Sequence, residues 1–263
     1  MRYYKKSLGQ NFLVDLNIVN KIFNITNLEN KDILEIGPGK GALTDQIIKA
    51  KPKSLILVEK DNLLSDKLKS KYLKYNNLKI YNEDILKFNI EKKIKKNTII
   101  FGNLPYNISS QILIKMIKFN KWPPKYSALI FMFQKEMADR IMGQQGSSNY
   151  GRLSILTNYR LSIKKKFNVS SNCFFPKPKV DSTVLFLKPK NKIYNKIKKL
   201  DNLETITNIF FSNRRKMINK KINIIFKKFK KIDLIKNLNL RARPSDLKPE
   251  KYYQLTELFE KIC

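Results

Sequence analysis

Short apolar segments alternate with segments of helical periodicity through the first half of this chain. Apolar runs occupy residues 32–36, 54–59, 78–82, 98–101 and 126–133, and each has the length of a buried strand. Helical patterns fill the intervals: 14–24, 43–50, the lysine-rich stretch around Leu64, Leu68 and Tyr72, 108–119 and 134–142. Such an alternation is typical of a mostly parallel sheet that is covered on both faces. The pattern therefore predicts an α/β fold.

The pattern changes after Tyr150. Two β-like stretches, near 161–168 and 180–187, flank the proline-punctuated loop Phe174-Phe-Pro-Lys-Pro-Lys-Val180. We expect them to pair as a hairpin that closes the sheet, which would give a Rossmann-like sheet of about seven strands. Beyond Lys188-Pro-Lys190 only helical patterns follow: about 201–211, 214–229 and 249–262.

These observations predict two domains. The first is an α/β domain over residues 1–189, and the second is a small, basic, helical domain over residues 190–263. The break falls where proline and lysine replace the apolar pattern.

The charge of the chain favours a polyanionic partner. Lys and Arg number 54 against 21 Asp and Glu, which gives a formal net charge of +33. A field of this sign attracts nucleic acid. Most of the excess is lysine, alongside much asparagine and isoleucine, a combination that genome composition alone can also produce. Part of the charge therefore needs no functional explanation.

Several classes of protein are excluded by residues that the chain lacks. Histidine is absent, which rules out a Ser-His-Asp or Cys-His nucleophile system and a His-ligated metal. The two cysteines, Cys173 and Cys263, lie too far apart in sequence to indicate a disulfide framework or a metal site. The first ten residues are basic and polar without an apolar core, so we expect no secretory signal and a cytoplasmic protein.

A glycine-rich loop follows the first predicted strand. In Glu35-Ile-Gly37-Pro-Gly39-Lys-Gly41, the glycines allow a tight turn and a close approach of a ligand to the backbone. Glu59 ends the second strand, where a carboxylate can accept hydrogen bonds from ribose hydroxyls. Alone, the loop is equally consistent with a simple strand-to-helix turn. Together with Glu59 it indicates an adenosine-containing cofactor.

The pattern G-x-G-x-G differs from the G-x-G-x-x-G of dinucleotide-binding folds. Glu35 directly before it would repel a pyrophosphate but suits a cation. S-adenosylmethionine, which carries a sulfonium and an ammonium group, fits that sign. Asp84, after the third strand, is placed to accept from an adenine amino group. Its alternative role is a helix or turn cap.

The segment Asn103-Leu104-Pro105-Tyr106 follows the fourth strand. The Asn103 side-chain oxygen and a backbone carbonyl near Leu104 can both accept from the exocyclic amine of a base. Pro105 stiffens the loop, and Tyr106 offers a flat face for stacking. Two acceptors on the amine protons can turn the nitrogen lone pair toward a methyl donor. Alignment and local electrostatics then carry the rate without a histidine.

With these motifs in place, the sequence resembles the KsgA-type small-subunit ribosomal RNA adenine dimethyltransferases of the rRNA adenine N6-methylase family. The resemblance runs nearly end to end. Its matching stretches are Gly9-Gln-Asn-Phe-Leu13, Glu35-Ile-Gly-Pro-Gly39, Val58-Glu59, Glu83-Asp84, Asn103-Leu-Pro-Tyr106, Tyr150-Gly-Arg-Leu-Ser154, Phe174 to Ser182 and Asn213-Arg-Arg-Lys216.

The resemblance implies roles for these residues. Tyr106 and Phe174 would sandwich an adenine that has left its stack. The S-adenosylmethionine site would be formed by Asn11, Leu13, Gly37, Glu59, Asp84 and Asn103. The implied product is N6,N6-dimethyladenosine at two adjacent adenines near the 3′ end of small-subunit (16S) rRNA, in a pre-30S particle. The implied enzyme is a cytoplasmic monomer without a metal or a membrane partner.

The basic tail suggests a grip on RNA phosphates. Arg214, Arg215, Lys216, Lys220 and Lys221 fall within the helix expected over 214–229, and Lys227-Lys228 would extend it. Base choice would come from the pocket and from RNA shape. The alternative is an ordinary solvated helix face.

Three rival functions stay open at this point. Lys177 in the loop after Phe174 is similar to the large-subunit methylases of the macrolide-resistance type, whereas Val180-Asp-Ser182 and Tyr150-Gly-Arg-Leu-Ser154 favour the small-subunit group. Lys40 in the glycine loop also departs from the family pattern. A non-catalytic ribosome-assembly factor on the same fold is the second rival, and a DNA adenine methylase is the third.

Overall fold

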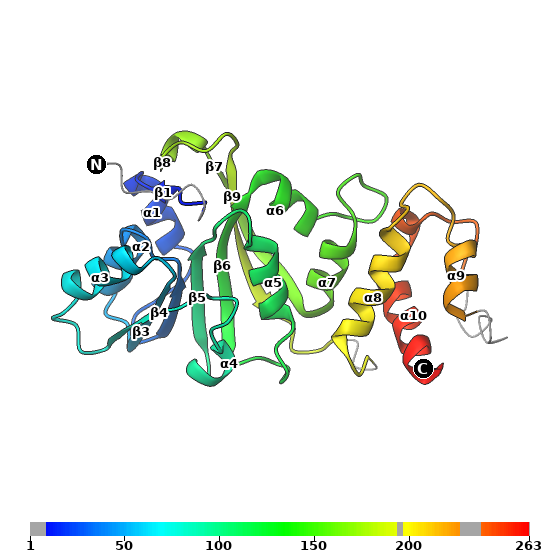
Figure 1. The fold of residues 1–263 in the computed structure, drawn as a ribbon, viewed down its shortest axis with the longest axis horizontal. Coiled ribbons are helices and arrows are strands. Elements are labelled where there is room, and N and C mark those ends of the chain that lie inside the picture. Colours follow the sequence, from blue (N-terminus) through cyan, green and yellow to red (C-terminus); the bar gives the residue numbers. More distant parts are fainter. Residues whose placement is uncertain (1–8, 194–196, 227–237, 263) are drawn as a thin grey trace. The chain divides into compact units, whose positions relative to one another are not determined.

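The computed structural model describes residues 9–193, 197–226 and 238–262 of the chain (Figure 1). They form two compact units. The first comprises residues up to 138 together with 162–189, and the second comprises 139–161 together with the residues from 190 onward. Among the described helices, none is long and apolar enough to cross a membrane.

The first unit is built on a seven-stranded sheet with the strand order β4-β3-β2-β5-β6-β9-β7. Its strands are β2 (Asp32–Ile36), β3 (Ser54–Glu59), β4 (Leu78–Asn82), β5 (Thr98–Asn103), β6 (Tyr126–Gln134), β7 (Leu161–Val169) and β9 (Ser182–Pro189). The pairs β2–β3, β2–β5, β3–β4 and β5–β6 are parallel, and β6–β9 is antiparallel. The predicted α/β fold with a mostly parallel seven-strand sheet is confirmed, and β7 and β9 are neighbours as expected.

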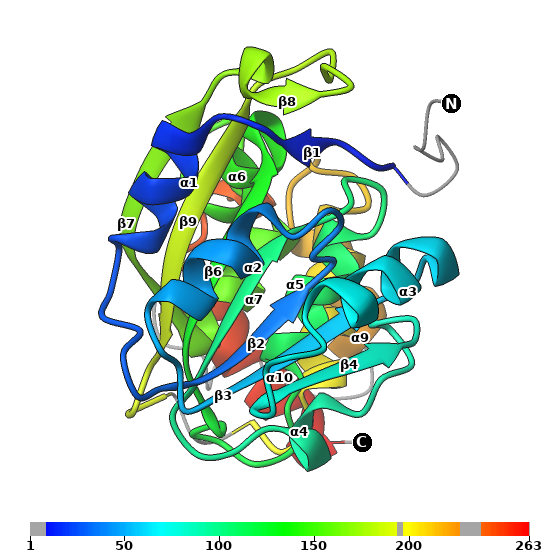
Figure 2. The same ribbon diagram turned by 90° about the vertical axis from the view of Figure 1, so that its left-hand side faces the viewer.

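Helices lie on both faces of this sheet (Figures 1 and 2). They are α1 (Leu16–Phe23), α2 (Ala42–Lys49), α3 (Asn62–Lys71), α4 (Ile90–Lys93), α5 (Ser109–Ile117) and α6 (Lys135–Ile141), the last of which crosses into the second unit. On one face Val19 and Ile22 of α1 and Ile47 of α2 join a buried cluster with Leu57 and Ile130 of the strands. Apolar residues at helical spacing thus supply the core that sequence periodicity predicted.

A small second sheet lies beside the large one. Strands β1 (Phe12–Leu13) and β8 (Phe174–Phe175) pair antiparallel, with Phe12 opposite Phe175 and Leu13 opposite Phe174 (Figure 2). This sheet joins the N-terminal residues to the loop between β7 and β9. Neither strand is predictable from its residues, because two residues carry no periodic signal.

The second unit is helical. It contains α7 (Arg152–Arg160), α8 (Leu200–Phe211), α9 (Asn219–Phe226) and α10 (Pro249–Ile262). The Tyr253 hydroxyl of α10 donates to the Ile155 carbonyl of α7 at 3.3 Å, and the ring of Tyr252 lies 5.6 Å from that of Phe210 in α8. The helices expected at 201–211 and 249–262 are therefore present.

The structure differs from two sequence expectations here. Residues 139–161, expected in the catalytic domain, belong to the second unit because α7 packs with α8 and α10. The expected helix over 214–229 begins only at Asn219, and its last residues, 227–229, lie outside the described part of the chain. Turns occupy the stretch before it, where the Arg214 guanidinium donates to the carbonyls of Ser147 and Ser148.

Candidate active site

A cavity of about 250 Å³ opens at the carboxyl ends of the parallel strands in the first unit. The loops after β2, β3, β4 and β5 line it, together with residues 9–14, which we call the N-terminal segment. Ligands of open α/β sheets bind at this edge. All the residues predicted for the cofactor site line this cavity: Asn11, Leu13, Gly37, Glu59, Asp84 and Asn103.

The glycine loop and Glu59 form one hydrogen-bonded unit. The Glu59 carboxylate accepts from the Gly39 N–H at 3.1 Å and from the Asp61 N–H at 2.9 Å. Gly37 and Gly39 adopt φ angles of 64° and 59°, which favour glycine over other residues. A Cβ atom at Gly39 would also lie 2.9 Å from the Phe12 ring. The backbone at this turn therefore lies directly against the Phe12 ring in the cavity wall.

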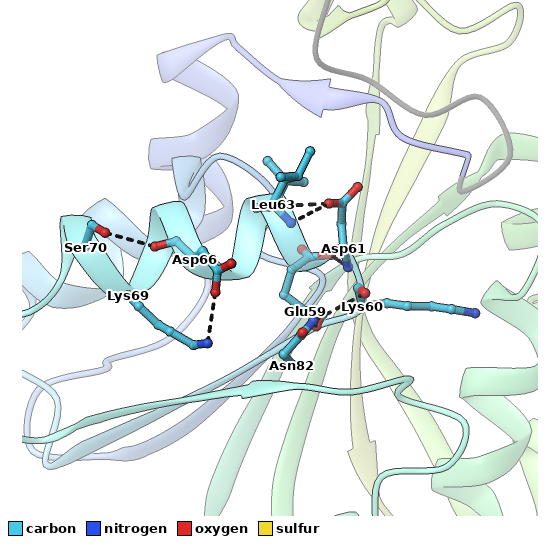
Figure 3. A network of polar contacts seen from close by, with 9 residues as sticks. Glu59, Lys60, Asp61, Leu63, Asp66, Lys69, Ser70 and Asn82 are labelled. Atoms are coloured by element: carbon cyan, nitrogen blue, oxygen red, sulfur yellow. Dashed lines mark hydrogen bonds and ion pairs between the residues drawn. The ribbon is translucent and has the colours of Figure 1, made fainter.

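The end of β3, at Glu59, is hydrogen-bonded to a side chain of the neighbouring strand β4. The Asn82 side-chain amide of β4 donates to the Glu59 carbonyl at 2.9 Å (Figure 3). Asp61 caps α3 by accepting from the Leu63 N–H at 3.0 Å (Figure 3). It also accepts from the Gln10 side chain at 3.2 Å, which anchors the N-terminal segment. Glu59 is 6% exposed, and burial raises its pKa.

Glu35 lies in the wall of the cavity and is almost fully buried. Burial raises its pKa to about 8, and the nearby carboxylates of Asp45 and Glu59 act in the same direction. The Thr44 hydroxyl donates to Glu35 Oε2 at 2.6 Å. Without a cation beside it, Glu35 is therefore mostly protonated at neutral pH.

Asp84 lies on the β4 side of the cavity and is paired there. Its Oδ2 atom lies 2.8 Å from the Lys60 ammonium, and its Oδ1 atom accepts from the Leu86 N–H at 2.9 Å. The hydrogen bond from Lys60 holds the pKa of Asp84 below its usual value. Asp84 thus caps a turn, which was one of the two roles weighed from the sequence, and it also lines the cavity, while its contact with an adenine amino group stays a prediction.

The tetrapeptide Asn103-Leu-Pro-Tyr106 continues directly from β5 and lines the cavity. The Asn103 side-chain Nδ2 donates to the Asn11 carbonyl of the N-terminal segment at 2.9 Å. A carbonyl is only an acceptor, so this contact identifies which amide atom faces it. Asn103 Oδ1 is consequently turned away from Asn11. Leu104 is buried, and the Pro105 carbonyl accepts from the Ile108 N–H at 3.1 Å.

Tyr106 is half-buried, and its hydroxyl shares a hydrogen bond of 2.8 Å with the Ser182 hydroxyl. Its backbone carbonyl accepts from the Ser109 hydroxyl at 3.2 Å. Sequence reasoning did not identify Ser182 as a site residue, because its partner lies 76 positions away. Its place at the end of the matching stretch that begins at Phe174 was the available signal.

Phe174 stands apart from the other predicted site residues. It is 3% exposed, belongs to the core cluster of the first unit, and does not line the cavity. Because side chains alternate along a strand, its neighbour Phe175 points outward and is 53% exposed. The sandwich of an adenine between Tyr106 and Phe174 therefore stays a prediction.

The basic residues predicted for RNA binding separate into two groups in the second unit. Arg215, Lys216 and Lys220 are exposed. Lys221 is 7% exposed, and its ammonium donates to the Phe210 carbonyl, so it is not available to a phosphate. Burial lowers the pKa of Lys221. Arg214 is likewise engaged with the carbonyls of Ser147 and Ser148.

A metal centre is not apparent in the described ranges. No group of three or more Cys, Asp or Glu side chains there is arranged to hold a metal ion. The chain contains no histidine that would add to such a group.

The similarity of this chain to known proteins extends over nearly its whole length. A family model described as ribosomal RNA adenine dimethylase matches residues 1–261. The ribosomal RNA small subunit methyltransferase A of Pelagibacter ubique (strain HTCC1062) is 46% identical over 261 residues, which is 98% of this chain and 97% of the relative. The protein of the same name from Mycoplasma mobile is 42% identical and covers 93% of both chains.

Two solved structures are similar to this chain over 95% of its length. A dimethyladenosine transferase from Plasmodium falciparum superposes with a TM-score of 0.76 at 27% identity, covering 95% of this chain and 96% of that one. The 23S rRNA methyltransferase ErmE superposes with a TM-score of 0.70 at 22% identity, covering 95% of this chain and 100% of that one. The second likeness shows a shared fold alone.

Proposed function

Because this chain belongs to the ribosomal RNA adenine dimethylase family, we propose that it transfers methyl groups from S-adenosylmethionine to the N6 atoms of two adjacent adenines near the 3′ end of small-subunit rRNA. The observation that carries this proposal is the Asn103 amide, which is held by the Asn11 carbonyl beside the cavity at the strand ends.

The cavity suits a cationic adenosine derivative. Four acidic residues line it, namely Glu35, Glu59, Glu83 and Asp84, and its glycine turn leaves the backbone open to a ligand. Glu59 retains acceptor capacity beyond its two backbone donors, since a carboxylate accepts about four hydrogen bonds. When bound, S-adenosylmethionine supplies the electrophilic methyl group. Glu59 would hold the ribose, Asp84 the adenine, and Glu35 the charged end.

Asn103 would do the central chemical work. Its Oδ1 atom, turned away from Asn11, would accept one proton of the adenine amine, and the Leu104 carbonyl would accept the other. In the first transfer both acceptors would favour a tetrahedral nitrogen with its lone pair directed at the methyl group, and the methylated nitrogen would then release one proton to solvent. In the second transfer the amine has a single proton left, so one of the two acceptors would hold it. Rate enhancement would come from alignment and from preorganised dipoles. Tyr106 would support the base by stacking.

The small-subunit substrate is favoured by the named relatives. The two proteins described above carry the name small subunit methyltransferase A at 46% and 42% identity. The stretches Tyr150-Gly-Arg-Leu-Ser154 and Val180-Asp-Ser182 are similar to the same group. A cytoplasmic enzyme acting as a monomer on a pre-30S particle is the corresponding setting.

RNA retention would fall partly to the second unit. Arg215, Lys216 and Lys220 present exposed cations, whereas Lys221 and Arg214 support the local fold. These contacts would position the RNA without reading its sequence.

Methyl transfer from labelled S-adenosylmethionine tests this function. Undermethylated small subunits and protein-free large-subunit rRNA are offered side by side, and the labelled base is mapped. We expect label on the small-subunit RNA alone. Label on large-subunit RNA would support the resistance-type methylase, and label on neither, without cofactor affinity in calorimetry, would support the assembly factor.

A further inference from the structure

Ser182 is a fully buried hydroxyl in contact with the proposed base-stacking ring. It is 0% exposed, and its Oγ atom lies 2.8 Å from the Tyr106 hydroxyl oxygen. The two residues come from different parts of the site, since Tyr106 follows β5 and Ser182 begins β9. Buried hydroxyls are normally hydrogen-bonded, and the partner of this one is the hydroxyl of the half-buried Tyr106.

The backbone that carries Ser182 is fixed on both sides. Ser182 pairs with Gln134 of β6 in the antiparallel ladder. The Asp181 carbonyl just before it accepts from the Lys135 N–H at 3.0 Å, and the Asp181 carboxylate accepts from the Ser171 N–H at 2.9 Å. Ser182 therefore presents its hydroxyl from a rigid strand end.

A stacking ring needs such a fixed point. Tyr106 has two rotatable side-chain torsions. Its carbonyl accepts from the Ser109 hydroxyl, and the Pro105 carbonyl before it accepts from the Ile108 N–H. The hydrogen bond at the far end of the side chain fixes the position of the hydroxyl oxygen, and so the direction of the ring axis, before a base arrives. Preorganisation of this kind reduces the entropy lost on binding.

We infer that Ser182 is a positioning residue for methyl transfer, whose hydroxyl holds the far end of the Tyr106 ring in the place where the target adenine meets it. This inference rests on the proposed function and on the stacking role of Tyr106. It assigns to Ser182 no contact with the cofactor or the base.

A double-mutant cycle in kcat/KM for undermethylated small subunits tests the inference. Ser182→Ala and Tyr106→Phe each remove one partner of the same hydrogen bond, so each should lower kcat/KM by roughly 3- to 12-fold, as one net hydrogen bond allows. The double variant should be no worse than either single variant, within about twofold.

The matched control is Thr183→Val. Thr183 is the next residue of β9, is 1% exposed, and donates to the Asn168 side chain at 3.0 Å. The substitution removes an equally buried hydroxyl from the same strand without touching Tyr106. It should leave kcat/KM unchanged within about twofold, and any shift in melting temperature should match that of Ser182→Ala.

Two results overturn the inference. One is wild-type kcat/KM in Ser182→Ala, and the other is a cost of Ser182→Ala that is as large in the Tyr106→Phe background as in the wild type. Tyr106→Ala separates this failure from failure of the proposed function. An inactive wild type would contradict the function, and an active Tyr106→Ala would contradict the role of the ring. If the wild type is active and Tyr106→Ala is inactive, but the losses in kcat/KM from Ser182→Ala and Tyr106→Phe still add, only the role of Ser182 is wrong.

Discussion

The Asn103 side-chain amide donates to the backbone carbonyl of Asn11 across 92 positions of sequence, at a distance of 2.9 Å. This bond joins the N-terminal segment, which lines the cavity, to the loop proposed to carry catalysis. It also sets the direction of the amide, because only the NH₂ end can face a carbonyl. The N-terminal segment and the proposed catalytic loop are thus joined by a direct hydrogen bond.

Asn103→Asp tests that direction. Aspartate has the shape of asparagine, but an ionised carboxylate cannot donate to the Asn11 carbonyl and is repelled by it. We expect Asn103→Asp to lower kcat/KM at least tenfold. Asn103→Ala should lower kcat/KM by about 10²- to 10³-fold, the range seen when one preorganised polar group is removed. The methyl-transfer rate is measured alongside the melting temperature. An aspartate variant within about threefold of the wild type would contradict this orientation.

Glu35→Gln should change stability in a pH-dependent manner. Burial raises the pKa of Glu35 from its usual 4.5 to about 8, so the folded chain binds more protons than the unfolded chain between these pH values. Wild-type stability from this group is therefore lost as pH rises from about 4.5 to about 8. Glutamine keeps an acceptor for Thr44 and does not titrate. The melting temperature of the variant minus that of the wild type should therefore be higher at pH 9 than at pH 5.

Melting temperatures of both proteins at these two pH values measure the effect. Titrations common to both chains cancel in the difference. The same difference in melting temperature at pH 5 and pH 9 would show that Glu35 is not perturbed by burial.

Phe174 and Phe175 should respond differently to truncation. Phe174→Ala removes a ring from the core and should cost about 3–5 kcal/mol of unfolding free energy. Phe175→Ala removes a side chain that is 53% exposed and should cost less than about 1 kcal/mol. Urea denaturation gives both values. Equal losses would mean that β8 presents its side chains differently from the structure.

Exposed and buried lysines of the second unit should differ in their effect on RNA binding. Lys216→Ala and Lys220→Ala should each reduce the slope of log K against log salt by about 0.7–0.9 if each contacts one phosphate. Lys221→Met keeps the buried stem and should leave the slope unchanged, because the Lys221 ammonium donates within the protein. Filter binding over a range of salt concentrations checks this. A reduced slope for Lys221→Met would place that ammonium on RNA.

The first unit was largely predictable because its sequence obeys simple rules. Buried parallel strands such as β2 and β3 are short apolar runs that end in glycine or glutamate, and these ends carry the cofactor motifs. The edge at which Gly37, Glu59, Asp84 and Asn103 meet follows from strand direction alone. The family resemblance added Asn11 and Leu13, which no local pattern indicates.

The remaining features depend on tertiary contacts. Helix α7 is buried on most of its surface, so it lacks an apolar stripe that would separate it from a loop. Lys221 lies three residues after the buried Ile218 and next to the buried Ile222, and this apolar face was the available sign of its burial. The contacts of Asn11 with Asn103 and of Ser182 with Tyr106 link distant residues and have no local signature.

Nucleoside analysis of the reaction product tests the central claim most directly. Undermethylated small subunits are incubated with the protein and excess S-adenosylmethionine, and their RNA is digested and analysed by mass spectrometry. The account predicts N6,N6-dimethyladenosine at two adjacent adenines, which is four methyl groups per particle, and formation of this product about 10²- to 10³-fold more slowly with Asn103→Ala. Methylation that stops at monomethyladenosine, or that appears only on large-subunit RNA, would contradict it.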